Sequence, residues 1–495
     1  MDLVAEEMCR LPGVRRQLGR LAADLDAGLT CVWLLPDHMV AAGYAEELHL
    51  TALYQSSERL NLPEPPTGTS SRATPTVFEA VGPHIDDLPV LDDYDDGFDI
   101  GWESAPSRPR ADVVATEPAP SDLVARLAKE LSVAPDEVME TLIRPSTRWH
   151  PVIGIRAWAE PEPLRQSRER GSERGQDIAR LIRVLGAAVK EAGLPPEARP
   201  RLLVTARVRD LPALLPDELE LDLAATAVHW WWGVIGRLDT ATVISARSDH
   251  GMRSSRRGGE ALRSRILRAV REEVVSEVCG PDLALAVGLT RKWDGSDRTL
   301  DGCLRACLTD GLVPSATSGA TKHGVAGTEH RPGANLRTAW AQGTVQSWEG
   351  RSRAHPASWY LDGRTTRPDA LATLVSQAQQ RVLLPWIEEA RRRLATIALP
   401  CATRPVIDLV SRYIERPPTD FRTHPRRAFE GIEVGPMLKA HRDGQLRLPV
   451  DEARLLEVLV TVRNVLSHRG VLYDATLMTL CTELARADRR WAQNE

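Results

Sequence analysis

The residues best suited to chemistry lie near the C-terminus, in the string RNVLSHRG at 463–470. Arg463, Asn464 and His468 interrupt an apolar, helix-like run, and Gly470 is a typical helix stop. Histidine titrates near neutral pH and can take or give a proton. Arginine presents a fork of donors to phosphate oxygens. These residue types are those that metal-independent RNA cleavage needs, a base for the 2′-hydroxyl and a cation for the phosphate.

The spacing of this string sets a geometric condition. Five residues on an unbroken helix correspond to about 140° of rotation, so the Arg463 and His468 side chains would diverge. They converge only if the helix ends near His468 or if a second chain supplies a facing pair. The alternative is structural, because Arg and His at a helix end often cap the last carbonyls and complement the dipole.

The setting of the string, late in an all-helical segment at 401–495, resembles the HEPN family of small helical-bundle domains. The signature of that family is Arg, a polar residue that is often Asn, three variable residues and His. The resemblance implies a metal-independent ribonuclease site completed across a homodimer, with Arg463 and His468 catalytic and Asn464 positioning them. Many family members keep the fold and act as binding modules, so RNA binding without cleavage stays open.

A second unusual string is HWWW at 229–232. Adjacent side chains diverge on a helix or strand, so Trp230, Trp231 and Trp232 cannot all face one core. Tryptophan is enriched at interfaces, and at least one of the three is therefore predicted to lie between domains or against a partner. The alternative is that all three pack within the chain.

A phosphate-binding loop is absent from the sequence. The string GxxxxGK[ST] supplies amides and a lysine to phosphates, and none of the five lysines follows a glycine or precedes Ser or Thr. The seven cysteines form no disulfide or zinc pattern. We therefore predict neither cofactor nor metal, and an active nucleotide hydrolase is the least favoured function.

The apolar patterns predict an α/β protein with a helical end. Strand-like runs at 29–36, 150–160 and 199–208 alternate with helical ones such as 177–193, and 221–246 suggests a strand or a helix, a turn and then a strand. This alternation indicates a mainly parallel, three-layer sheet module, followed by an all-α helical bundle. The predicted domains are 1–300, with an acidic loop at 62–112, then a loop and helical extension at 301–400, and the helical domain at 401–495.

Four stretches resemble degenerate STAND-type P-loop NTPases of bacterial conflict systems. They are LTCVWLLPDHMV at 29–40, RPRLLVTARVRDLP at 199–212, HWWWGVIGRLD at 229–239 and QQRVLLPWIEEARRRL at 379–394. The resemblance implies an inactive module that couples a partner's signal to an effector. With the HEPN-like domain, it predicts an antiphage-defence protein that cleaves or senses RNA. The alternative is a non-catalytic adaptor that binds a partner ATPase or protease.

Composition places few further limits on function. The net charge of −5 does not mark the whole chain as a nucleic-acid binder. The N-terminal residues lack the apolar core of a signal peptide, and no apolar run reaches 18 residues. We therefore expect a cytoplasmic protein without a membrane segment, whose partners are RNA, other proteins of a defence system, and a second copy of itself.

Overall fold

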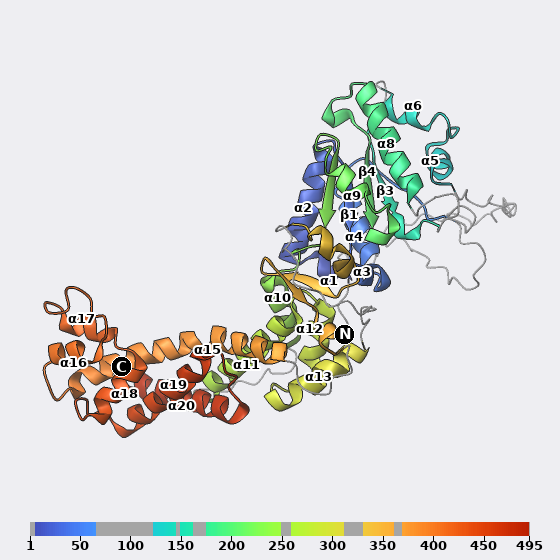
Figure 1. The fold of residues 1–495 in the computed structure, drawn as a ribbon. Helices are drawn as coiled ribbons and strands as arrows, with labels where there is room; N and C mark the ends of the chain where they lie inside the picture. Colours follow the sequence, from blue (N-terminus) through green and yellow to red (C-terminus); the bar gives the residue numbers. More distant parts are fainter. Residues whose placement is uncertain are drawn as a thin grey trace, which may run out of the picture.

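The computed structural model describes residues 5–65, 122–144, 149–161, 175–248, 259–310, 330–360 and 369–494. Most of the predicted acidic loop, at 66–112, lies outside the described residues. The N-terminal half holds a five-stranded parallel sheet and the C-terminal part is helical (Figure 1), which confirms the predicted fold class.

The sheet has the strand order β2-β3-β4-β1-β5, with every neighbouring pair parallel. Its central strands are mostly apolar and are buried at every position after the first, as expected for a parallel sheet covered on both faces. Three of them were predicted from their apolar runs. The strands are β1 (Thr30–Leu34), β2 (Arg59–Asn61), β3 (Val152–Arg156), β4 (Arg201–Ala206) and β5 (Thr226–Trp230).

Helices cover the sheet on both faces. The connection from β1 to β2 runs across the sheet in one direction, and those from β3 to β4 and from β4 to β5 run in the other. Because such crossovers are right-handed, their helices lie on opposite faces. One face carries α2 (Pro12–Asp26), α3 (Asp37–Ala41) and α4 (Tyr44–Leu53), next to α1 (Ala5–Cys9). The other carries α8 (Gln176–Glu191) and α9 (Leu215–Leu219), with α5 (Leu123–Leu131) and α6 (Val138–Ile143) packed on α8.

The helical part begins immediately after β5. Its elements are α10 (Arg237–Ser248), α11 (Gly259–Cys279), α12 (Leu283–Lys292), α13 (Asp297–Asp310), α14 (Arg337–Ala341), α15 (Asp369–Ala398), α16 (Val406–Tyr413), α17 (Pro425–Glu430), α18 (Val434–Arg442), α19 (Val450–Ser467) and α20 (Asp474–Asn494). A small antiparallel hairpin, β6 (Val345–Trp348) and β7 (Arg351–Ala354), lies between α14 and α15. Within the described helices, none has the length and apolar character needed to span a membrane.

Two hydrophobic cores organise these elements. The first surrounds the sheet, and the second runs from Ile244 to Trp491, through α11, α15, α19 and α20. Helix α10 contributes Val243 to the first core and Ile244 to the second, and α12 is divided between the two cores in the same way. The two lobes in Figure 1 are therefore joined through α10 and α12. The second core does not divide near residues 300 and 400, where domain ends were predicted.

Two elements differ from the sequence predictions. The run TATVISA, predicted as a strand, lies within helix α10. The Asp239 carboxylate in its first turn accepts a hydrogen bond from the Gly236 amide at 2.8 Å, an arrangement that favours a helix start over a strand. The hairpin β6–β7 was not predicted, because the region after residue 335 was interpreted as helical.

Candidate functional site

The predicted C-terminal residues lie where helix α19 ends. Its last helical residue is Ser467, and His468 is the C-cap with φ −87° and ψ 13°. Arg469 then takes a left-handed conformation, and the amides of Arg469 and Gly470 donate to the carbonyls of Leu466 and Val465. This is a Schellman motif, with Arg469 rather than a glycine in the left-handed position. Gly470 is still required, because a Cβ there would lie 2.9 Å from the Val465 side chain.

Two glutamines on α15 hold this end of α19 in place. The Gln380 amide donates to the Leu466 carbonyl at 2.7 Å. The buried Gln379 amide donates to the Leu472 carbonyl at 2.8 Å and accepts from the Leu472 amide at 2.7 Å. The turn at 468–472 is therefore fixed to the long helix that also packs against α11.

The string does not form a closed site within one chain. Asn464 and His468 are exposed and, being four residues apart, share a helix face. Arg463 is five residues from His468 and pairs with Glu433, at the start of α18, at 2.8 Å. The helix ends next to His468, as the first condition for convergence requires, while the Arg463 guanidinium is engaged by Glu433. A facing chain is the second way to complete the pair.

The three adjacent tryptophans are buried within the chain. Trp230, Trp231 and Trp232 are 2%, 9% and 3% exposed, so they offer no open surface to a partner. Trp230 packs edge-on against Trp340, and Trp231 packs against Trp33. Of the three, Trp231 lies at the junction of the two lobes, where it lines a cavity.

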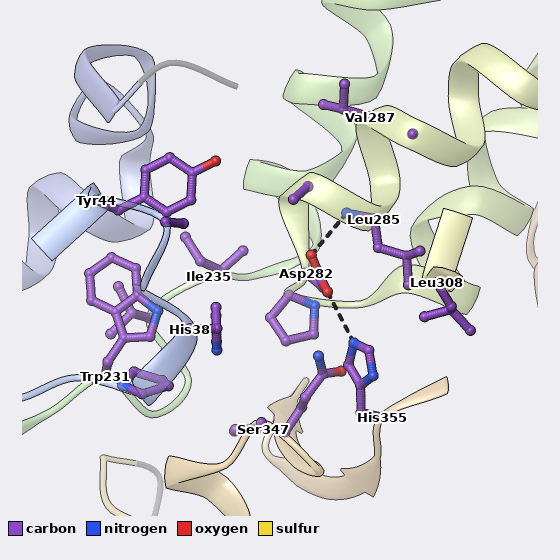
Figure 2. Close-up of a pocket in the computed structure, with 18 of the residues that line it drawn as sticks. His38, Tyr44, Trp231, Ile235, Asp282, Leu285, Val287, Leu308, Ser347 and His355 are labelled. Carbon is purple, nitrogen blue, oxygen red and sulfur yellow. Dashed lines mark hydrogen bonds and ion pairs between the residues drawn. The ribbon is translucent and has the colours of Figure 1, made fainter. Parts of the chain in front are cut away.

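That cavity was not predicted and lies at the carboxyl ends of β1 and β5 (Figure 2). Ligands of open parallel sheets commonly bind at this edge. Its volume is about 530 Å³. One wall comes from the loops after β1 and β5, and the opposite wall from α12 and α13. The hairpin β6–β7 and the following residues close it below.

A polar corner of the cavity is built by Asp282 and His355. Asp282 caps α12 by accepting from the Leu285 amide at 2.9 Å, and its other oxygen lies 3.0 Å from His355 Nε2. His355 Nδ1 accepts from the Ala357 amide at 3.1 Å, so the neutral ring carries its proton on Nε2 and donates it to Asp282. Burial alone would raise the pKa of Asp282, but the His355 and Leu285 hydrogen bonds outweigh it and lower that pKa. The carboxylate therefore stays ionised and its corner is internally satisfied.

His38 lies on the other side of the cavity, as the second residue of α3. Its side chain is exposed and lines the cavity, and desolvation by the surrounding protein lowers its pKa, with Asp282 opposing the effect. Within the described part of the chain, its side chain makes no hydrogen bond. His38 is therefore a neutral imidazole that offers one donor and one acceptor to the cavity.

Sequence reasoning missed this site because its residues are far apart along the chain. Asp282 and His355 are separated by 73 positions. The one local signal was Asp282 itself, an N-cap residue in front of the apolar run LALAVGL. Across the described ranges, no group of three or more His, Cys, Asp or Glu side chains is arranged to hold a metal ion.

Comparison with protein-family models, curated proteins and solved structures gives no match for this chain.

Proposed function

We propose that this chain is a regulatory protein of bacterial conflict or antiphage defence, in which an NTPase-like α/β module without a phosphate loop controls an RNA-directed helical domain. The observation that carries the proposal is the placement of His468. It is exposed on an ordered helix end, beside Asn464, and α15 holds that end through Gln379 and Gln380. Helix α15 in turn packs on α11, which continues from the junction of the lobes.

Cleavage of RNA by this site requires two copies. One chain presents His468 and Asn464 on one face and Arg463 on another, so a complete pair of base and cation would combine His468 of one copy with Arg463 of the other. The Glu433 carboxylate now paired with Arg463 is half exposed, and an RNA phosphate can compete for the guanidinium.

The test is cleavage of single-stranded RNA by the full-length protein in EDTA. His468→Ala and Arg463→Ala should each lower the rate by about 100-fold or more, the usual loss for a general base. The matched controls are His424→Ala and Arg442→Ala, two exposed residues of the same domain, which should leave the rate unchanged.

Mixing the two inactive variants tests the shared site. Random exchange makes half of the dimers mixed, each with one intact pair, so about one quarter of the wild-type rate should return. No recovery would contradict a site shared between chains. Loss of activity in the control variants would assign the cleavage to the general charge or stability of the domain, and equal activity in all variants would assign it to a contaminant.

The second candidate function is a non-catalytic adaptor for a partner ATPase or protease. The Arg463–Glu433 ion pair favours it, because the only predicted catalytic cation is already engaged within its own chain. An adaptor would show no cleavage in EDTA and RNA affinity unchanged by Arg463→Ala and His468→Ala.

A further inference from the structure

The walls of the cavity are largely apolar and aromatic. Trp231 and Tyr44 stand on the sheet side with Ile235, and Leu285 and Val287 face them from α12 (Figure 2). Trp340, also in the lining, donates its indole N–H to the Trp231 carbonyl at 3.2 Å. Its ring therefore presents carbon rather than a polar group to the cavity. Such walls favour a ligand with a flat, apolar body.

Among the described lining residues, the His38 imidazole and the Gln346 Oε1 atom are available to orient a ligand. Asp282 and His355 satisfy each other and the backbone, as described above. The His38 imidazole makes no hydrogen bond to the described residues and faces the space between the walls. The exposed His38 ring can be reached directly by a ligand, and a ligand donor would recover the free energy that the buried, unpartnered Gln346 acceptor costs.

The sheet side of the cavity is unfavourable to phosphate, whereas Arg291 and Lys292 line the α12 side. The connection from β1 to α3 is Leu35 and Pro36, and proline has no amide to donate. Asp37 opens α3 with a carboxylate, and Asp282 is ionised on the opposite wall. Phosphate groups are usually held by clustered amides at a glycine-rich turn, and this turn lacks them.

We propose that the cavity binds a planar aromatic small molecule that carries a hydrogen-bonding head, with the flat body between Trp231 and Leu285 and the head on His38. The ligand would touch both lobes at once, through the β1 and β5 loops on one side and α12 and the hairpin on the other. Occupancy would therefore stabilise their relative position. Ligand binding in the cavity is independent of RNA cleavage or binding at the end of α19. Either proposal can therefore be contradicted while the other holds.

The experiment is isothermal titration of the full-length protein with two probes. Indole-3-carboxamide has a flat body and a head that donates and accepts, and indole lacks the head. We expect the carboxamide to bind about tenfold more tightly than indole, the usual value of one satisfied hydrogen bond. His38→Ala should remove that difference by weakening the carboxamide alone. Because the His38 side chain makes no hydrogen bond to the described residues, this variant should fold normally.

A second variant tests the place of binding. Ile235→Trp fills the cavity from the sheet side and should abolish binding of both probes, whereas His424→Ala, on the distant α17, should change neither. The proposal is overturned if neither probe binds or if both variants leave binding intact. Circular dichroism of Ile235→Trp separates a filled cavity from an unfolded chain, and His38→Ala decides the matter if that variant is unfolded.

Discussion

Gly13 is a residue of the sheet lobe at which the packing leaves no room for a side chain. It lies in the first turn of α2, and its amide donates to the buried Asp239 carboxylate at 2.9 Å. A Cβ at this position would stand 2.0 Å from the Val234 carbonyl oxygen, a backbone atom that cannot turn aside. The loop after β5, which forms one wall of the cavity, therefore rests directly on this glycine.

Gly13→Ala is expected to destabilise the protein by about 2–3 kcal/mol, because the backbone must move to admit the methyl group. The matched control is Gly19→Ala on the same helix, where a Cβ meets no atom within 4 Å. That variant should gain roughly 0.5–1 kcal/mol from helix propensity. Urea unfolding of both variants measures the difference, and equal stabilities would contradict the predicted close packing.

The residues of the two candidate sites differ in how far the sequence could predict them. The helix end at the RNVLSH string followed from Gly470 and the apolar pattern, which are local signals. The pairing of Arg463 with Glu433 did not, because it depends on how α18 packs against α19. The cavity was out of reach for the same reason, since Asp282, His355 and His38 meet only when three distant elements assemble.

Four elements of the junction are joined by a network of charges. Arg237, at the start of α10, pairs with Glu273 and Glu277 on α11 and with Glu349 in the hairpin turn. Arg381 on α15 contacts the same two α11 carboxylates, at 2.8 and 2.9 Å. Glu277 is almost fully buried, so its charge depends on these partners. The network links α10, the first helix after the sheet, to α11 and α15, the long helices of the second core.

Arg237→Met keeps most of the side-chain volume and removes the charge that three carboxylates share. We expect a loss of about 3 kcal/mol in unfolding free energy, since Glu273 and Glu277 keep only Arg381. The control is Arg393→Met on α15, whose exposed pair with Glu389 should be worth less than about 1 kcal/mol. Denaturant unfolding at pH 7 tests both changes, and a loss no larger than that of the control would show that Arg381 suffices.

Helices and strands were predicted best from the sequence where the apolar pattern of a run agrees with its burial in the fold. The runs at 30–34 and 201–206 are mostly apolar and lie in the centre of the sheet. Helix α10 was mistaken for a strand because Thr, Val and Ile favour strands locally, while the Asp239 hydrogen bonds and two flanking cores determine the outcome. The hairpin β6–β7 is four residues long on each side, too short to stand out from its sequence.

The whole molecule has two cores, and the second is shared between the C-terminal helices and helices that precede residue 401. Helices α19 and α20 pack against α15 and α11, which lie before that residue. We therefore expect a change in the junction helices to affect the end of α19, where His468 lies. The sequence could not reveal this, because the amphipathic pattern of α11 shows that one face is buried but not which helix covers it.

Ile266→Ala tests this coupling in the full-length protein. Ile266 is fully buried in α11, and its truncation should cost about 2–5 kcal/mol. Because α11 and α20 pack together, hydrogen exchange should accelerate in both helices and in α19, and stay unchanged in β1 and β4. The matched control is Ile153→Ala in β3, equally buried in the first core, which should accelerate exchange in the sheet only. If Ile266→Ala leaves α19 and α20 protected, the helical domain at 401–495 folds on its own and the junction cannot reach His468 by this route.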